Sequence, residues 1–213
     1  METEQQRQVT GADSNPEEHF AKRLILASTS PRRAEILRMV GWPFDKYAVP
    51  IDESRRPNEA PVAYVERLAL EKAEAAAAGQ LSAPPASRVI LGADTVVVVE
   101  ADLLGKPADE NDARRMLRQL SGRWHEVITG VALIRSGAGG NARRVAHERT
   151  RVRFATMTAD EIEWYVATGE PMDKAGAYAI QGNAARFIEE IQGDYLNIVG
   201  LPVRLVYKLL REF

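Results

Sequence analysis

The sequence contains no cysteine among its 213 residues and only three histidines. The absence of cysteine excludes disulfide bonds, thiolate zinc sites, iron–sulfur clusters and a cysteine nucleophile. The histidines, His19, His125 and His147, lack the close spacing that is typical of a histidine metal site. Any metal that the protein binds is therefore expected to have oxygen ligands, as Mg²⁺ and Mn²⁺ do.

Long apolar runs and a strong excess of one charge are also missing. No run reaches the roughly 18 apolar residues that a membrane-spanning helix needs. The 28 Lys and Arg residues nearly balance the 30 Asp and Glu residues, for a net charge of −2. The basic residues are spread among acids and are not interleaved with aromatic residues, unlike those of nucleic-acid-binding proteins. We therefore expect neither a nucleic acid nor a membrane as partner.

The first 22 residues differ from the rest of the chain, because they hold five acidic and two basic residues and few apolar ones. Such a segment buries too little apolar surface to offset its ordering entropy. It also lacks the basic and apolar regions of a secretory signal, which predicts a cytoplasmic protein. We predict a disordered acidic tail over 1–22 and a single domain over 23–213.

Strands and helices alternate along the predicted domain. Apolar, β-branched runs predict strands, and apolar residues at steps of three and four between caps and glycines predict helices. The expected strands are 24–28, 88–100, 124–135 and 143–154, with a strand pair around 187–191. The expected helices are 31–40, 61–79, 109–121, 159–168 and one from about 201. This mixture predicts an α/β (mixed α+β) fold with one central sheet.

A first candidate site is the segment Ser28-Thr-Ser30-Pro-Arg32-Arg33, where a strand ends and a helix begins. Free backbone N–H groups and the positive end of the helix dipole would face one point there. The hydroxyls of Ser28 and Ser30 and the guanidinium groups of Arg32 and Arg33 would complete an anion or phosphate site. The alternative is an ordinary N-cap at Ser30 followed by two solvated arginines.

The second candidate is Asp94, inside the apolar run VILGADTVVVV. A carboxylate in such a strand is costly unless it is paired, hydrogen-bonded or bound to a metal. Functional carboxylates in α/β sheets often lie near strand ends beside the ligand. In a regular strand Thr95 would project to the opposite face from Asp94. The alternative is a turn between two shorter strands.

Two lysines are further candidates. Lys72 lies on the helical stripe of Val65, Leu68 and Ala69 that should face the core, so its ammonium group must either reach solvent or meet an anion inside the fold. Lys106 precedes Pro107 in a tight turn, where a solvated lysine is the ordinary interpretation.

The acidic pair Asp52-Glu53 precedes an arginine-rich loop. The pair could be solvated. Together with Asp94 it could also supply the oxygen ligands of Mg²⁺ or Mn²⁺, which substrate phosphates and water would complete.

The segment from Asp173 to Gly182 is expected to be a strand interrupted by small residues, ending in Gln181 and Gly182. The glycine permits a close backbone approach, and the amide of Gln181 can read a pattern of donors and acceptors such as the edge of a base.

Taken together, these features resemble the Maf family of nucleoside triphosphate pyrophosphatases. The resemblance runs from about Leu24 to Leu210 and rests on segments that follow one another in the family's order. These are LILASTSPRRAEIL, Asp52-Glu53, LALEKA, VILGADTVVV, GKP, MLRQLSGRWHEVITGVAL, GEPMDKAGAYAIQG and GDYLNIVGLP.

The resemblance implies an elongated sheet with flanking helices and two lobes around a cleft, as in the inosine triphosphate pyrophosphatases. It implies that a divalent metal assists hydrolysis of a nucleoside triphosphate to the monophosphate and pyrophosphate, and that the protein is a homodimer. On this basis we expect Asp94 to be the general base and a metal ligand, with Glu53 as second ligand. Substrate-binding roles are expected for Ser28, Ser30, Arg32, Arg33, Lys72, Thr95, Lys106 and Gln181.

Three positions separate the subgroups of the family. The subgroup that prefers dTTP and UTP has two arginines after Ser-Pro, Asp-Thr in the strand and Ile-Gln-Gly later, as in Arg32-Arg33, Asp94-Thr95 and Ile180-Gln181-Gly182. The chain departs at all three from the subgroup similar to 7-methyl-GTP pyrophosphatases. A pyrophosphatase for modified nucleotides and a nucleotide-binding regulator of septum formation or cell division are the alternatives.

Overall fold

The computed structural model describes residues 24–79, 88–136 and 142–212. Its centre is a seven-stranded mixed sheet in the order β2-β1-β3-β5-β6-β7, with β4 paired to β3. β1 runs parallel to β2 and β3, and the other pairs are antiparallel. The strands are β1 Leu24–Leu26, β2 Phe44–Lys46, β3 Arg88–Val99, β4 Asp102–Leu104, β5 Trp124–Ser136, β6 Ala142–Phe154 and β7 Ile188–Gln192.

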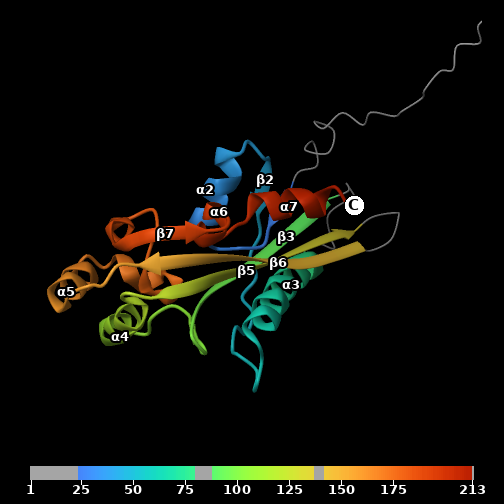
Figure 1. Cartoon of the computed structure of the whole chain (residues 1–213). Helices are drawn as coiled ribbons and strands as arrows, with labels where there is room; N and C mark the ends of the chain where they lie inside the picture. The colour runs from blue at the N-terminus through green and yellow to red at the C-terminus, as the bar shows by residue number, and fades with distance from the viewer. Residues whose placement is uncertain (1–23, 80–87, 137–141, 213) are drawn as a thin grey trace, which may run out of the picture.

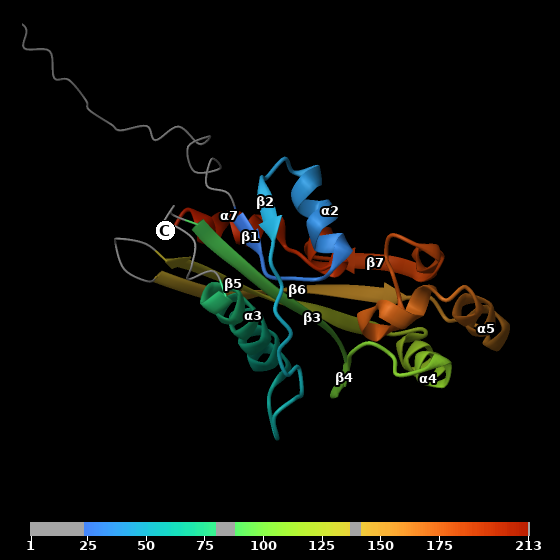
Figure 2. The same ribbon diagram turned by 180° about the vertical axis from the view of Figure 1, so that it is seen from behind.

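Helices flank this elongated sheet on both faces (Figures 1 and 2). Helix α3 covers one face, α2, α6 and α7 cover the other, and α4 and α5 lie together at one end. The helices are α2 Pro31–Met39, α3 Pro61–Gly79, α4 Glu110–Leu120, α5 Ala159–Ala167, α6 Tyr195–Val199 and α7 Val203–Leu210. Three short 3₁₀ helices follow α5, namely η1 Glu170–Asp173, η2 Ala175–Ala177 and η3 Asn183–Phe187.

Two glycines allow α3 to lie unusually close to the sheet. A Cβ atom at Gly92 of β3 would overlap the backbone carbonyl oxygen of Ala69, and one at Gly130 of β5 would overlap that of Val65. Since both obstacles are helix backbone, they could be relieved only if the helix moved away. The two glycines therefore set the distance between α3 and the strand that carries Asp94.

The edge of β3 that faces β1 is only partly paired within the described residues. β1 pairs with Val89–Leu91 and β4 with Val97–Val99, so residues 92–96 have no strand beside them on that edge. The other edge of β3 pairs with β5 throughout this stretch. The interruption lies at the carboxyl end of β1, which is where ligands bind in open α/β sheets.

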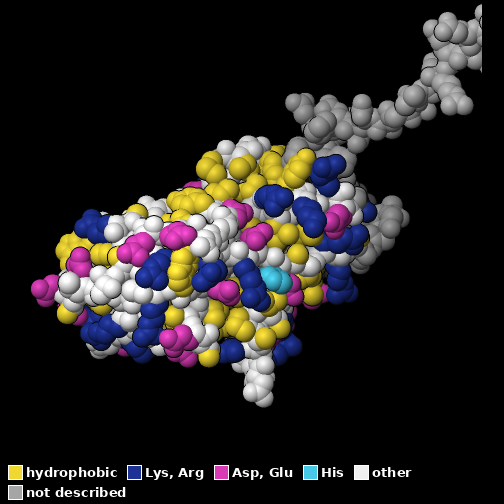
Figure 3. All heavy atoms as spheres, viewed as in Figure 1, with side chains coloured by type: hydrophobic (Ala, Val, Ile, Leu, Met, Phe, Trp, Pro, Cys, Tyr) yellow, Lys and Arg dark blue, Asp and Glu magenta, His cyan; other side chains and the backbone are white. Residues whose placement is uncertain are grey.

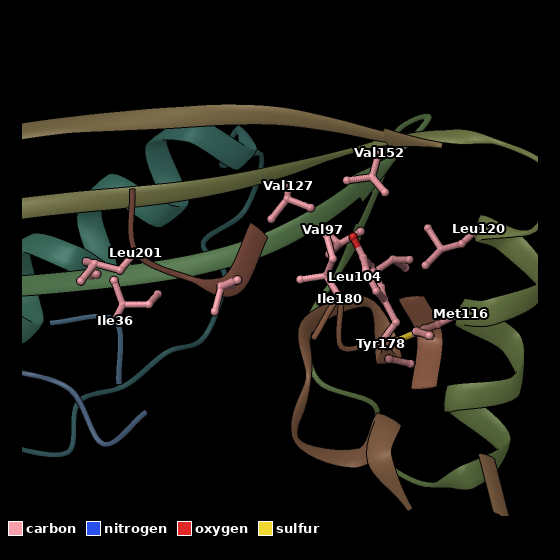
Figure 4. Packing of buried hydrophobic residues seen from close by; sticks show 14 of the residues in the cluster. Ile36, Val97, Leu104, Met116, Leu120, Val127, Val152, Tyr178, Ile180 and Leu201 are labelled. Atoms are coloured by element: carbon pink, nitrogen blue, oxygen red, sulfur yellow. The ribbon is translucent and has the colours of Figure 1, made fainter. Parts of the chain in front are cut away.

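The main core extends from beneath α2 to α4 and α5. Figure 4 shows Val97, Leu104, Val127, Tyr178 and Ile180 near one another, with Met116 and Leu120 beyond them. The segment that holds Tyr178 and Ile180 is therefore part of the packed interior and not a surface excursion.

The structure confirms most of the expected elements. Helix α3 occupies the predicted 61–79, Asp109 caps α4, and Thr158 and Glu161 form a capping box at α5. The prediction of a strand over 173–182 is wrong, because these residues form 3₁₀ turns in which Gly176 and Ala177 have positive φ angles. One strand, β7, stands where a pair was expected, and α6 was not anticipated.

Charged side chains of both signs are interspersed with apolar ones on the face shown in Figure 3. Along β6, Arg143, Arg149 and Arg153 form ion pairs with Glu74, Glu126 and Glu189. In the parts of the chain that the structure describes, no helix combines the length and apolar character required to cross a bilayer. The predicted tail 1–22 lies outside the described residues.

Candidate active site

The centre of the site is an ammonium group between two carboxylates. Lys72 Nζ on α3 lies 2.6 Å from Asp94 Oδ1 on β3 and 2.7 Å from Glu53 Oε1 in the loop before α3. The side chains of Lys72 and Asp94 are each 13% exposed, whereas that of Glu53 is 55% exposed. Lys72 therefore meets anions inside the fold, and the alternative that it reaches solvent is wrong.

The charges around Glu53 favour its ionised form. Partial burial acts to raise the pKa of Glu53, but the hydrogen bond and charge of Lys72, together with the charges of Lys106 and Arg33, outweigh burial and lower it. This result also places Lys106 and Arg33 within electrostatic reach of the same carboxylate. Asp52, the other half of the acidic pair, is exposed and accepts a hydrogen bond from Ser54 N. The structure thus brings only Glu53 of the pair to Asp94.

The loop that carries Glu53 is fastened to α3 by side chains of the helix. Tyr64 Oη donates to the Glu53 carbonyl oxygen at 2.8 Å. Arg67 donates to the Ser54 carbonyl oxygen at 3.1 Å and to both carboxylate oxygens of Glu59 at 2.6 and 2.8 Å. The hydrogen bonds from Arg67 are the main reason that the pKa of Glu59 falls to about 2. These contacts hold Glu53 over Lys72.

Arg33 is the most constrained of the predicted anion-binding residues. It is only 7% exposed, and it donates to the Gly200 carbonyl oxygen at 2.9 Å, Ser28 Oγ at 2.9 Å and Thr95 Oγ1 at 3.1 Å. Burial lowers its pKa, while the carboxylates of Asp94 and Glu53 oppose that shift. The alternative of a solvated arginine is wrong for Arg33, which instead ties the start of α2 to β3 and to the end of α6.

Arg32, unlike Arg33, contacts the turn after α5. Its guanidinium group lies 3.2 Å from Asp173 Oδ2, and the same carboxylate also pairs with Lys174. Partial burial acts to raise the pKa of Asp173, but Lys174 and Arg32 outweigh burial and lower it. Asp173 therefore partly neutralises two cations at one edge of a pocket.

This pocket lies on the face of β3 opposite Lys72, because Thr95 and Asp94 are successive residues of one strand. Arg32, Thr95, Lys174 and Gln181 supply its polar groups. Its apolar lining includes Val97, Val127, Tyr178, Ile180, Ile198 and Val199. Apolar walls with a few polar groups suit a flat, partly polar molecule.

Asp94 and Thr95 lie in the unpaired stretch 92–96, so the carboxylate cluster and the pocket meet across a single open edge of β3. Arg33 bridges the two sides, because it bonds Thr95 and is coupled by charge to Asp94. The structure thus places the predicted residues around one site, except that Ser30 is an N-cap by position only. Its side chain makes no capping hydrogen bond, and its N–H donates to Ser28 Oγ.

Sequence reasoning missed several residues of the site. Lys174 and Tyr178 lie in the segment 173–182, of which the sequence predicts only Gln181 as a substrate-binding residue. Arg67 lies four residues before Glu71, a spacing that predicts an ion pair across one helical turn. The structure contains this ion pair. Its bonds to Glu59 and Ser54 cross to a loop, and no local pattern indicates them.

The site has a limited capacity for metal ions. Among the described residues, no group of three or more His, Cys, Asp or Glu side chains converges as a ligand set. Asp94 and Glu53 do converge, since both lie within 2.7 Å of the Lys72 ammonium. Two carboxylates fit Mg²⁺ or Mn²⁺, which usually keep water ligands and take others from substrate phosphates.

Known proteins are similar to this chain in sequence and in fold. A protein titled the Staphylococcus aureus Ham1 protein superposes with a TM-score of 0.51 at 12% identity, covering 90% of this chain and 99% of that one. The dTTP/UTP pyrophosphatase of Symbiobacterium thermophilum is 52% identical over 90% of this chain and 94% of its own length. The dTTP/UTP pyrophosphatase of Hahella chejuensis is 48% identical over 94% of this chain and 96% of its own length.

The likeness to the Ham1 protein shows the fold alone, because the identity is low. The family model described as Maf-like protein matches residues 23–213, which include every residue of the site. With that match and relatives about half identical over nearly their whole length, the chain belongs to the Maf family.

Proposed function

We propose that the protein is a pyrophosphatase that hydrolyses dTTP and UTP to the nucleoside monophosphate and pyrophosphate. The observation that carries this proposal is the position of Asp94 and Thr95 on one open strand edge, with a charged cluster on one side and a pocket on the other. A nucleotide is divided in the same way, into a charged triphosphate and a flat, partly polar base. The likeness to dTTP/UTP pyrophosphatases supports dTTP and UTP as the substrates.

The base would enter the pocket beside Thr95. The faces of a pyrimidine would pack against its apolar lining, which includes Val127 and Ile198. The amide of Gln181 can donate to a carbonyl oxygen and accept from the ring N–H, which is the pattern at the edge of thymine and uracil. Cytosine presents the reverse pattern at this edge, an amino donor beside a ring nitrogen acceptor, so an amide held in one orientation distinguishes it.

The triphosphate would lie along the open edge of β3 among Arg32, Lys72, Lys106 and the start of α2. Charge builds up on the leaving pyrophosphate in the transition state, and cations held in position stabilise it. To contact phosphate, Arg32 must exchange the carboxylate of Asp173, which is more than half exposed, for a phosphate oxygen. Arg33 acts indirectly, by orienting Ser28 and Thr95.

Asp94 is the proposed general base. One of its oxygens is bonded to Lys72, and the carboxylate can accept a proton from a water molecule that attacks the α-phosphorus. Asp94 and Glu53 would together hold Mg²⁺ or Mn²⁺. Such an ion, when bound, lowers the pKa of a water ligand and neutralises phosphate charge. The cytoplasmic location and the homodimer stay predictions from the sequence.

The test is release of pyrophosphate from a panel of the standard nucleoside triphosphates and 7-methyl-GTP, with Mg²⁺, with Mn²⁺ and with EDTA. We expect kcat/KM for dTTP and UTP to exceed that for the other nucleotides about tenfold or more, the size of one hydrogen-bond difference at a base edge. EDTA should abolish turnover. Preference for 7-methyl-GTP would contradict the proposed substrates, and nucleotide binding without pyrophosphate release would indicate a regulator.

A further inference from the structure

Two residues outside the pocket, Tyr165 and Glu170, are joined to its wall by hydrogen bonds. Tyr165 on α5 is fully buried, and its hydroxyl donates to Glu170 Oε1 at 2.8 Å and accepts from Ala179 N at 3.1 Å. The other oxygen, Glu170 Oε2, accepts from Asn183 N at 2.9 Å and Asn183 Nδ2 at 3.0 Å. The pair thus holds residues 179 and 183 at the same time.

Between these two fixed points lies the part of the wall that faces the nucleotide site. Ile180 lines the pocket and packs into the core beside Val97 (Figure 4), and Gln181 is exposed at the pocket. A backbone bond from Gly182 N to the Ala179 carbonyl oxygen, at 3.1 Å, closes the turn. Residues 179–183 are therefore held by side-chain hydrogen bonds at both ends and by one backbone hydrogen bond across the turn.

Gly182 shows how closely the carboxylate approaches this turn. A Cβ atom at position 182 would overlap the carboxyl group of Glu170. Burial acts to raise the pKa of Glu170, but the N–H groups of Asn183 and Ala184 and the hydroxyl of Tyr165 lower it. The carboxylate is therefore ionised when it holds the turn, and charged acceptors make the stronger hydrogen bonds.

We propose that Tyr165 and Glu170 are positioning residues that set the place of Gln181 and, through it, the choice of base. This inference rests on the proposed function. Neither residue lines the pocket, so each acts through the turn at 179–183 and not on the substrate. Reading a base edge by hydrogen bonds requires the amide to be placed within about 0.5 Å. A long side chain such as glutamine reaches that precision only from a rigid backbone.

The test is a double-mutant cycle of Tyr165→Phe and Gln181→Ala, read as the ratio of kcat/KM for dTTP to that for dCTP. Tyr165→Phe removes the hydroxyl and keeps the ring. We expect it to lower the ratio roughly five- to tenfold, in line with one lost hydrogen bond, and to have no effect on the ratio in the Gln181→Ala background. Glu170→Gln, which keeps the size of the side chain, should act in the same direction. Tyr195→Phe, on the exposed Tyr195 of α6, is the matched control.

Equal losses for both nucleotides, or the same change of ratio with and without Gln181, would overturn the proposal and leave Tyr165 a purely structural role. Failure of the proposed function would be visible separately, as absence of pyrophosphate release by the wild-type protein. In that case the same cycle is read by calorimetry as the ratio of dTMP to dCMP affinities. An unchanged ratio in Tyr165→Phe, or binding of neither nucleotide by the wild-type protein, would also overturn it.

Discussion

Lys72 Nζ lies 2.6 Å from Asp94 Oδ1, so a helix on one face of the sheet and a strand within it contribute the two charges of one ion pair. Each side chain is largely buried, and either charge alone would be costly there. Glu53 adds a second carboxylate to the same ammonium group from a loop. This arrangement compensates the charge of the Asp94 carboxylate in an otherwise apolar strand and holds it beside the open edge of β3.

Asp94→Asn should lower kcat for dTTP by about 10²- to 10⁴-fold, the range for loss of a general base. The amide cannot accept a proton from water, but it has the same shape, so nucleotide binding should change little. Steady-state pyrophosphate release and calorimetric titration with dTMP would measure the two effects. Asp52→Asn is the matched control, because Asp52 bonds only its own loop. Near-normal turnover in Asp94→Asn would remove Asp94 from the mechanism.

Gly92→Ala should destabilise the fold and separate Lys72 from Asp94. The new methyl group would overlap the backbone of α3 at Ala69, and overpacking of this kind typically costs about 1–3 kcal/mol. Chemical denaturation would give the free energy of unfolding. Gly105→Ala is the control, because a Cβ atom there meets nothing within 4 Å. Equal stability of the two variants would show that α3 does not depend on the glycine contact.

Arg33→Lys should lower the free energy of unfolding by about 1–3 kcal/mol, because lysine cannot donate to Ser28, Thr95 and Gly200 from one planar group. Activity should fall as well, since the start of α2 loses its link to β3. Arg38→Lys, on the exposed side of the same helix, should be close to neutral. If both variants unfold at the same denaturant concentration as the wild-type protein, the Arg33 bonds are not a structural link.

His125 gives the protein a specific dependence of stability on pH. Burial lowers its pKa to about 3 in the folded state, against about 6.5 in the unfolded chain. Between these values the unfolded state binds the extra proton, so stability is full above about pH 6.5 and falls as the pH decreases. From pH 7 to pH 5 this one residue should remove about 2 kcal/mol of unfolding free energy.

Denaturation of His125→Gln at the two pH values would check this figure. The variant should lose less stability than the wild-type protein on acidification. An unchanged pH dependence in His125→Gln would mean that the pKa of His125 is the same in the folded and unfolded states.

Much of the architecture could be predicted from local patterns. Helix α3 and the cap of α4 follow from apolar spacing and from side chains that bond within one turn. The segment 173–182 could not be predicted in this way. Tyr178 and Ile180 are typical of a strand, which the small residues were expected only to interrupt. The conformation depends instead on Tyr165 and Glu170, which bond the segment from outside. The positive φ angles at Gly176 and Ala177 also oppose a strand.

The candidate site, too, could be predicted only in part from the sequence. Asp94 and Lys72 were conspicuous because a charge in an apolar strand or on a core-facing helical stripe needs a partner. That they are each other's partner depends on the close approach of α3 to Gly92, which is a tertiary contact. Arg33 was expected at the phosphate, and only the structure shows it buried against Ser28 and Thr95.

The central claim is that this site directs water to the α-phosphorus of a nucleoside triphosphate. Hydrolysis of dTTP in water enriched in oxygen-18, followed by mass spectrometry of the products, tests it most directly. We expect one labelled oxygen in dTMP, none in pyrophosphate, and loss of labelled product in Asp94→Asn. Label in pyrophosphate, or release of inorganic phosphate with dTDP, would place the attack at another phosphorus and contradict the proposed chemistry.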